Sequence, residues 1–178
     1  MERNKKRILR AFHTLICKKS LSKITIAEIC DEALMSRPTF YHYFHDKYDL
    51  VNCVFDELFD RTFQTISAEN AWFTNINCFL NELKQNSDFY TPCYKYTGQN
   101  NLEHHHYVRV YDFYAEFYEK SAGREMSREE QFSLELYCRG AVFMVAEWGR
   151  NGFTESSEWM TEQFKDSMTE DIQRHLIT

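Results

Sequence analysis

Residues 25–44 read TIAEICDEALMSRPTFYHYF, and their pattern is the most informative in the chain about its structure. Thr25 precedes a short apolar run and Glu28 follows three residues later, which is the pattern of a capping box at a helix N-terminus. Ser36 can cap a second, very short helix, and Pro38 lies in its first turn, where a missing N–H costs nothing. Two short helices joined by a few residues predict a helix-turn-helix over residues 25–44.

The second helix of this motif is too short and too polar to exist for packing alone. Phe40 and Phe44 are four residues apart and can both point into a core. The other faces are left to Arg37, Pro38, Thr39, Tyr41, His42 and Tyr43. Arg, Thr, Tyr and His side chains donate to phosphate oxygens or base edges, and a helix N-terminus attracts anions. Tyrosines that merely pack at a helix junction are the alternative, but the whole cluster beside Lys47 favours nucleic acid.

The charge of the chain is divided unevenly. Residues 1–50 carry ten Lys and Arg against six Asp and Glu, whereas residues 51–178 carry eleven against twenty-one. A basic head on an acidic body indicates that only the head approaches a polyanion. With five Gly and two Pro in 178 residues, the chain has little sequence for tight turns, which disfavours a sandwich or barrel and favours helices.

Helical periodicity continues on both sides of the motif. Before it, one apolar stripe contains Ile8, Phe12, Leu15 and Ile16. After it, Asp46 is expected to cap a helix whose apolar positions include Leu50, Val54, Leu58 and Phe59. Further helices are expected near residues 69–86, 88–97, 101–121, 127–150 and 155–176, separated by loop-like residue pairs.

The stretch of residues 25–50 resembles the signature of the tetracycline-repressor (TetR) family of transcriptional regulators. Ser36, the aromatic residues after it and Lys47 stand at the family's spacing. The resemblance implies an all-α protein with a three-helix helix-turn-helix domain of residues 1–62. It also implies a C-terminal helical bundle of residues 63–178 that dimerises and often binds a small inducer.

The resemblance also implies a function and a set of contacts. We expect a DNA-binding regulator, a repressor that binds a palindromic operator in double-stranded DNA as a homodimer. By position, Thr25, Thr39, Tyr41, Tyr43 and Lys47 resemble the phosphate-contacting set, and Arg37, Pro38 and His42 match positions at or near the base edges.

One position departs from the family pattern. Family members usually have Gly at the end of the first motif helix, where this chain has Leu34. Glycine adopts the left-handed conformation without strain, whereas leucine there costs about 1 kcal/mol. The departure favours an alternative, a co-regulator that does not bind DNA and acts by pairing with a related subunit.

The acidic body contains candidate interfaces. Apolar residues crowd all sides of residues 132–148, so this helix is expected to contact its own domain on one front and a partner subunit on the other, with Gly140 and Ala141 allowing close approach. The last helix repeats Trp159, Met160, Phe164, Met168, Ile172 and Leu176 and is a second candidate for the same interface. A single large monomer core is the alternative; the resemblance implies a dimer through the last two long helices.

A tyrosine stripe in the body suggests a ligand site. It comprises Tyr107, Tyr111, Tyr114 and Tyr118, beside Phe113 and Phe117. An aromatic cavity for a flat or cationic inducer is one interpretation, and ordinary core is the other, which we favour. His104, His105 and His106 are interpreted as a polar helix start, because consecutive helical residues point about 100° apart and cannot converge on one metal ion.

Several classes of protein find no support in the sequence. No catalytic set, phosphate loop or metal motif appears, so we expect neither an enzyme nor a cofactor. The six cysteines have no CxxC pair and are interpreted as reduced, mostly buried side chains. The N-terminus lacks the apolar region of a secretory signal, and no run approaches ~18 apolar residues. We therefore expect a cytoplasmic protein with no membrane partner.

Overall fold

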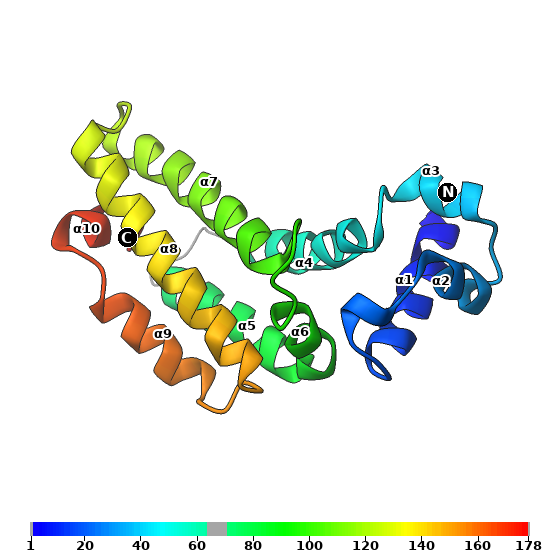
Figure 1. Cartoon of the computed structure of the whole chain (residues 1–178). Helices are drawn as coiled ribbons and strands as arrows, with labels where there is room; N and C mark the ends of the chain where they lie inside the picture. The colour runs from blue at the N-terminus through cyan, green and yellow to red at the C-terminus, as the bar shows by residue number, and fades with distance from the viewer. Residues whose placement is uncertain (1, 64–70, 178) are drawn as a thin grey trace.

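The computed structural model describes residues 2–63 and 71–177, and the regular structure within these ranges is helical. A small head at the N-terminal side is joined to a larger body by α4, which runs from one into the other (Figure 1). The predicted all-α class is confirmed. Within the two described ranges, no helix combines the length and the apolar character that crossing a membrane requires.

The head is built around a small aromatic and aliphatic core. Its elements are α1 (Glu2–Ile16), the 3-10 turn η1 (Leu21–Lys23), α2 (Ile26–Ala33), α3 (Arg37–Tyr43) and α4 (Lys47–Phe63). The stripe predicted for α1 buries Ile8, Phe12 and Ile16, and leaves Leu15 half-buried. Asp46 caps α4 as predicted, because its Oδ1 accepts from the backbone N–H groups of Tyr48 and Asp49, each at 2.8 Å.

The body is a bundle of α5 (Ala71–Gln85), α6 (Ser87–Tyr94), α7 (Leu102–Ala122), α8 (Arg128–Arg150), α9 (Ser157–Asp166) and α10 (Glu170–Leu176). The helices expected over 88–97, 101–121 and 127–150 match α6, α7 and α8 to within a few residues. The start expected at residue 69 lies outside the described residues. The expected division between residues 62 and 63 falls at the end of α4, and the two-domain division stays a prediction.

The single helix predicted over residues 155–176 is wrong, because the chain turns between α9 and α10. The Thr169 side chain caps α10 by accepting from the Ile172 N–H. The turn brings α10 against α7, so that Ile172 and Leu176 are buried there. The break in the helix thus comes with burial of two apolar side chains, which stabilises the turn.

The head lies against the body at α6. Phe89 of α6 makes an edge-to-face contact with Phe12 of α1, with ring centroids 5.9 Å apart. Tyr48, at the start of α4, stacks on Tyr96 just after α6, with centroids 4.5 Å apart. Farther along α4, Asp56 Oδ1 lies 2.8 Å from His105 Nε2 of α7 and accepts a hydrogen bond from it. Helix α4 therefore contacts the segment after α6 through Tyr48 and contacts α7 through Asp56.

The cysteines are less buried than predicted. All six are free, and Cys30, Cys93 and Cys138 are buried. Cys17 and Cys78 are exposed and Cys53 is intermediate. The expectation that most would be buried therefore holds fully for three of the six: Cys17 follows the end of α1 and Cys78 of α5 faces the solvent, whereas Cys53 packs partly against the core.

Candidate nucleic-acid interface

The first helix of the motif begins at the predicted capping box. The Glu28 N–H donates to the Thr25 hydroxyl oxygen at 3.3 Å, and the Thr25 N–H donates to Glu28 Oε2 at 2.9 Å. The Thr25 hydroxyl also donates to Glu28 Oε2, at 2.8 Å. Lys19 pairs with Glu28 at 2.5 Å; this contact, followed by the bond from the Thr25 backbone, lowers the pKa of Glu28 to about 2. Thr25 is exposed, but its hydroxyl proton is directed at its own helix.

The turn between the two helices contains the strained leucine that the sequence predicts. Leu34 has φ 50° and ψ 51°, in the left-handed region that favours glycine. The following Met35 N–H donates to the Cys30 carbonyl at 2.9 Å, which closes the helix end. The Leu34 side chain is 82% exposed, so no packing offsets the strain.

The second helix, α3, presents a polar face. Phe40 and Phe44 are buried as predicted, at 0% and 3% exposure. Ser36 caps the helix by accepting from the Thr39 N–H at 3.3 Å. On the outer side, Arg37, Pro38, Tyr41 and His42 are exposed, and Thr39 and Tyr43 are half-buried. The fold therefore gathers these predicted contact residues on one helix at the surface, with the two phenylalanines holding it from beneath.

Lys47 lies at the first residue of α4, and its ammonium group is already engaged. Nζ donates to three backbone carbonyls: Leu21 at 2.9 Å, Ser22 at 3.0 Å and Ile24 at 2.7 Å. An ammonium group has three N–H bonds. The expected phosphate contact of Lys47 stays untested, but all three donors point into the head in this structure.

The body exposes an apolar face on α8 and α9. The exposed large side chains there are Phe132, Leu136, Phe143, Met144 and Trp159. All of them except Phe132 line a groove of about 620 Å³ between α8, α9 and the start of α10, to which Gly140 and Ala141 also contribute. The opposite side of α8 buries Leu134, Cys138 and Val142 in the monomer core. Helix α8 therefore has two apolar fronts, and the contact of the second front with a partner subunit stays a prediction. Helices α9 and α10 bury most of their apolar stripe in the core of the chain itself.

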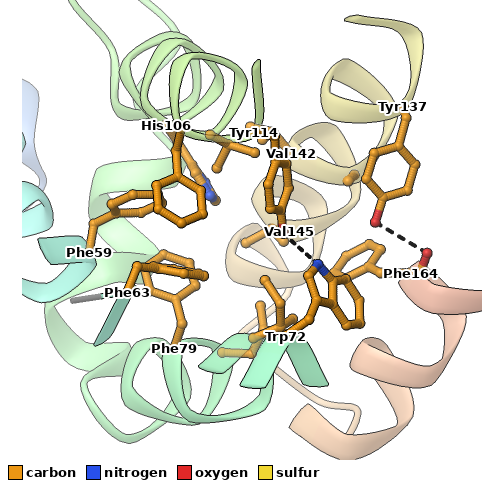
Figure 2. A pocket seen from close by; sticks show the side chains of 15 residues that line it. Phe59, Phe63, Trp72, Phe79, His106, Tyr114, Tyr137, Val142, Val145 and Phe164 are labelled. Carbon is orange, nitrogen blue, oxygen red and sulfur yellow. Dashed lines mark hydrogen bonds between the residues drawn. The ribbon is translucent and has the colours of Figure 1, made fainter. Parts of the chain in front are cut away.

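The predicted tyrosine stripe of α7 does not converge on one cavity. A cavity of about 40 Å³ lies among aromatic and aliphatic side chains of α4, α5, α7, α8 and α9 (Figure 2). Of the four tyrosines, it is lined by Tyr114, whose hydroxyl accepts from Trp72 Nε1 at 3.0 Å. Tyr107 instead lies under Arg139, and the Tyr118 hydroxyl donates to Asp171 at 2.6 Å. Tyr107 and Tyr118 are about 16 Å apart along the helix, so they contact different neighbours.

The space around Tyr114 is small. Ligand pockets usually hold about 300–1,000 Å³, and a water molecule occupies about 30 Å³, so this cavity has room for a few waters at most. The described structure is thus closed to an inducer at this place, and control by a small molecule stays untested.

Sequence reasoning missed one buried polar group beside this cavity. His106 is 2% exposed, so the interpretation of residues 104–106 as a polar helix start is wrong for this residue. Its Nδ1 lies 3.0 Å from the Tyr94 hydroxyl, and burial lowers its pKa to about 3. The spacing of Leu102 and His106, four residues apart on one face, was the available signal. Among the described residues, no group of His, Cys, Asp and Glu could hold a metal ion.

Comparisons with known proteins agree with this architecture. A family model described as bacterial regulatory proteins, tetR family, matches residues 8–54, and a TetR model described as transcriptional regulator C-terminal region matches residues 70–170. A solved structure named dihydroxyacetone kinase operon activator DhaS has a TM-score of 0.64 at 20% identity and covers 92% of each chain, which shows a common fold.

A curated relative is the HTH-type dhaKLM operon transcriptional activator DhaS of Lactococcus lactis subsp. lactis (strain IL1403). It is 27% identical over 97 residues, which cover 54% of this chain and 51% of the relative. The match therefore spans about half the length of that relative. Because the C-terminal family match alone covers more than half of the chain, this protein belongs to the TetR family and is a DNA-binding transcriptional regulator.

Proposed function

We propose that the protein binds a specific operator through the exposed face of α3. The observation that carries the proposal is the set of polar side chains on that face, held by the buried Phe40 and Phe44. Arg37, in the first turn, can donate two parallel hydrogen bonds to guanine O6 and N7 in a major groove. Pro38 and His42 would lie at or near the base edges.

The remaining contacts would go to the DNA backbone. We assign Thr25, Thr39, Tyr41 and Tyr43 to phosphates, which position the protein without reading sequence. Thr25 would have to turn its hydroxyl from Glu28 toward the DNA. Tyr41 needs no such change, because its side chain is 55% exposed.

We further propose that two copies pair through the exposed face of α8 and α9. The apolar side chains of that face, Phe132, Leu136, Phe143, Met144 and Trp159, are too large and too clustered for an isolated surface. A symmetric pair would place two copies of α3 on one side of the duplex. The operator would then be palindromic, with half-sites about 34–36 Å apart or a multiple of that spacing.

A binding titration tests the DNA contacts. Arg37→Ala should cost about 1–3 kcal/mol on the operator found by random-sequence selection and much less on a scrambled duplex. Tyr41→Phe removes only a hydroxyl, so a modest loss of similar size on both duplexes is expected. If the wild-type protein selects no duplex, specific DNA binding fails, and the co-regulator alternative takes its place.

The direction of regulation is a separate proposal. A dimer that occupies a promoter excludes polymerase, and we propose repression in the cytoplasm on this ground. The curated relative is named an activator, and activation is the competing outcome. A reporter gene placed behind the selected operator distinguishes the two outcomes. If the protein is a repressor, deleting its gene should raise reporter expression; if it is an activator, the deletion should lower reporter expression.

Control by a small molecule would act in the body, next to Tyr114. The cavity there would have to widen from about 40 Å³, so a ligand would bind a minor conformation and shift the population toward it. A linked change in operator affinity would be about 1–3 kcal/mol. The test is a ligand screen by thermal shift, followed by operator titration with each hit. If none of the hits changes the operator affinity, control by a small molecule is refuted.

A further inference from the structure

We propose that Lys47 is a positioning residue, which holds the start of α2 in place for DNA binding instead of contacting a phosphate itself. The inference rests on the DNA-binding surface described above and assigns a different role to one of its residues. It starts from the three carbonyls that surround the ammonium group, at 2.7–3.0 Å from Nζ.

The electrostatics of the site favour this arrangement. Lys47 is the first residue of α4, where the helix dipole disfavours a cation. Its side chain reaches the C-terminal end of η1, where backbone carbonyl oxygens carry partial negative charge; the Leu21 carbonyl also accepts from the Ile24 N–H at 3.3 Å. Burial lowers the pKa of Lys47, which agrees with an ammonium group drawn away from water.

The three hydrogen bonds from Lys47, which we call the Lys47 clamp, act on the peptide unit between Ile24 and Thr25, the N-cap residue of α2. The oxygen of this unit belongs to Ile24 and accepts from Lys47 at 2.7 Å. Its N–H belongs to Thr25 and donates to Glu28 at 2.9 Å. Both ends of one peptide plane are thus fixed, and the plane sets the direction in which Thr25 faces the solvent.

The same side chain joins the two halves of the DNA-binding motif. Lys47 lies only four positions after the end of α3, whereas its partners lie 23–26 positions earlier in the chain. It therefore fixes the position of the α2 N-terminus relative to the α3–α4 junction. Loss of the clamp would move Thr25 relative to the reading helix without removing either of them.

Replacement by arginine separates positioning from phosphate contact. An arginine keeps the charge and is a good phosphate ligand, but its planar fork cannot direct three N–H groups at three carbonyls around one point. Lys47→Arg should therefore lower the unfolding midpoint and weaken operator binding about tenfold at every salt concentration, with an unchanged salt slope. Lys47→Met should show at least the same losses, and Lys23→Met, which changes an exposed lysine of η1, should leave the unfolding midpoint unchanged.

Double-mutant cycles on operator affinity distinguish positioning from general stability. They are measured at a temperature where circular dichroism shows every variant fully folded. Lys47→Arg and Thr25→Ala should be non-additive, because the first acts through the second. Lys47→Arg and Arg37→Ala should be additive.

Three results would overturn the proposal. The first result concerns both variants: Lys47→Arg keeps the stability and the operator affinity of the wild type, and Lys47→Met has a smaller salt slope. A decrease of the slope by about one per subunit is what the loss of a phosphate contact requires. Another is additivity in both cycles. A third is that neither Lys47 variant folds, which would make the clamp purely structural. Failure of the wild-type protein to select a duplex would instead refute the DNA contacts proposed above, and the unfolding midpoints would still report on the clamp.

Discussion

His106 links the stability of the body to pH, because the fold keeps its ring uncharged. The ring is 2% exposed and its centroid lies 4.7 Å from that of Phe55 and 5.6 Å from that of Phe79. Burial, followed by the charge of His105, lowers the pKa of His106 from its ordinary value of 6.5 to about 3. In the unfolded chain the imidazole takes up a proton near the ordinary value, so acid favours unfolding.

The size of the effect follows from the two pKa values. Above the unfolded-state pKa, neither the folded nor the unfolded state binds a proton at His106, so this residue does not reduce the free energy of unfolding. Between about pH 6.5 and pH 3 only the unfolded state binds it, so the free energy of unfolding falls by about 1.4 kcal/mol per pH unit. From about pH 7 to pH 5 the loss is about 2 kcal/mol, out of the ~5–15 kcal/mol typical of a whole domain.

The assay compares His106→Gln with the wild type in urea at several pH values. Glutamine does not titrate and still offers a polar group to the Tyr94 hydroxyl. The variant should be less stable near neutral pH, and the difference should narrow by about 2 kcal/mol by about pH 5. Protein concentration is held constant, because dimerisation contributes to stability.

A matched control is His104→Gln, which changes an exposed histidine two residues away. Its unfolding free energy should follow that of the wild type across the pH range. If the wild type and His106→Gln lose stability in parallel as the pH falls, His106 does not remain uncharged in the folded protein and the reasoning is wrong.

Other predictions concern the motif and the subunit contact. Leu34→Gly should raise the free energy of unfolding by about 1 kcal/mol, because it relieves left-handed strain and loses no packing; a lower urea midpoint would contradict this. Glu28→Gln should destabilise the head near neutral pH, because the pKa of Glu28 is lowered in the folded state. The contribution of the Glu28 carboxylate to the free energy of unfolding is complete above the ordinary carboxyl pKa and is lost as the pH falls toward about 2. Unfolding curves that do not converge in acid would refute it. Phe143→Glu should give monomers by sedimentation, whereas Val108→Glu, on α7, should remain dimeric; two dimers would place the contact elsewhere.

The local architecture of the motif could be predicted from its amino acids alone. Thr25 with Glu28, Ser36 with Thr39, and Phe40 with Phe44 all interact within four residues, so helix geometry alone predicts them. The strain at Leu34 was predictable from the glycine that the family usually has at this position, because a left-handed helix end is easy for glycine and costly for leucine. The ranges of α6, α7 and α8 followed, to within a few residues, from the loop-like residue pairs that separate them.

Contacts between side chains of different helices could not be predicted and depend on how the helices pack. The partners of Lys47 lie 23–26 residues away, and nothing in the spacing indicates that three carbonyls surround its ammonium group. The tyrosine stripe of α7 diverges because each turn of the helix faces a different neighbour. His106 is buried, and the last predicted helix breaks near Thr169, because packing against other helices outweighs local preference. Periodicity tells which face of a helix is apolar, whereas the burial of a particular group depends on residues far away in the chain.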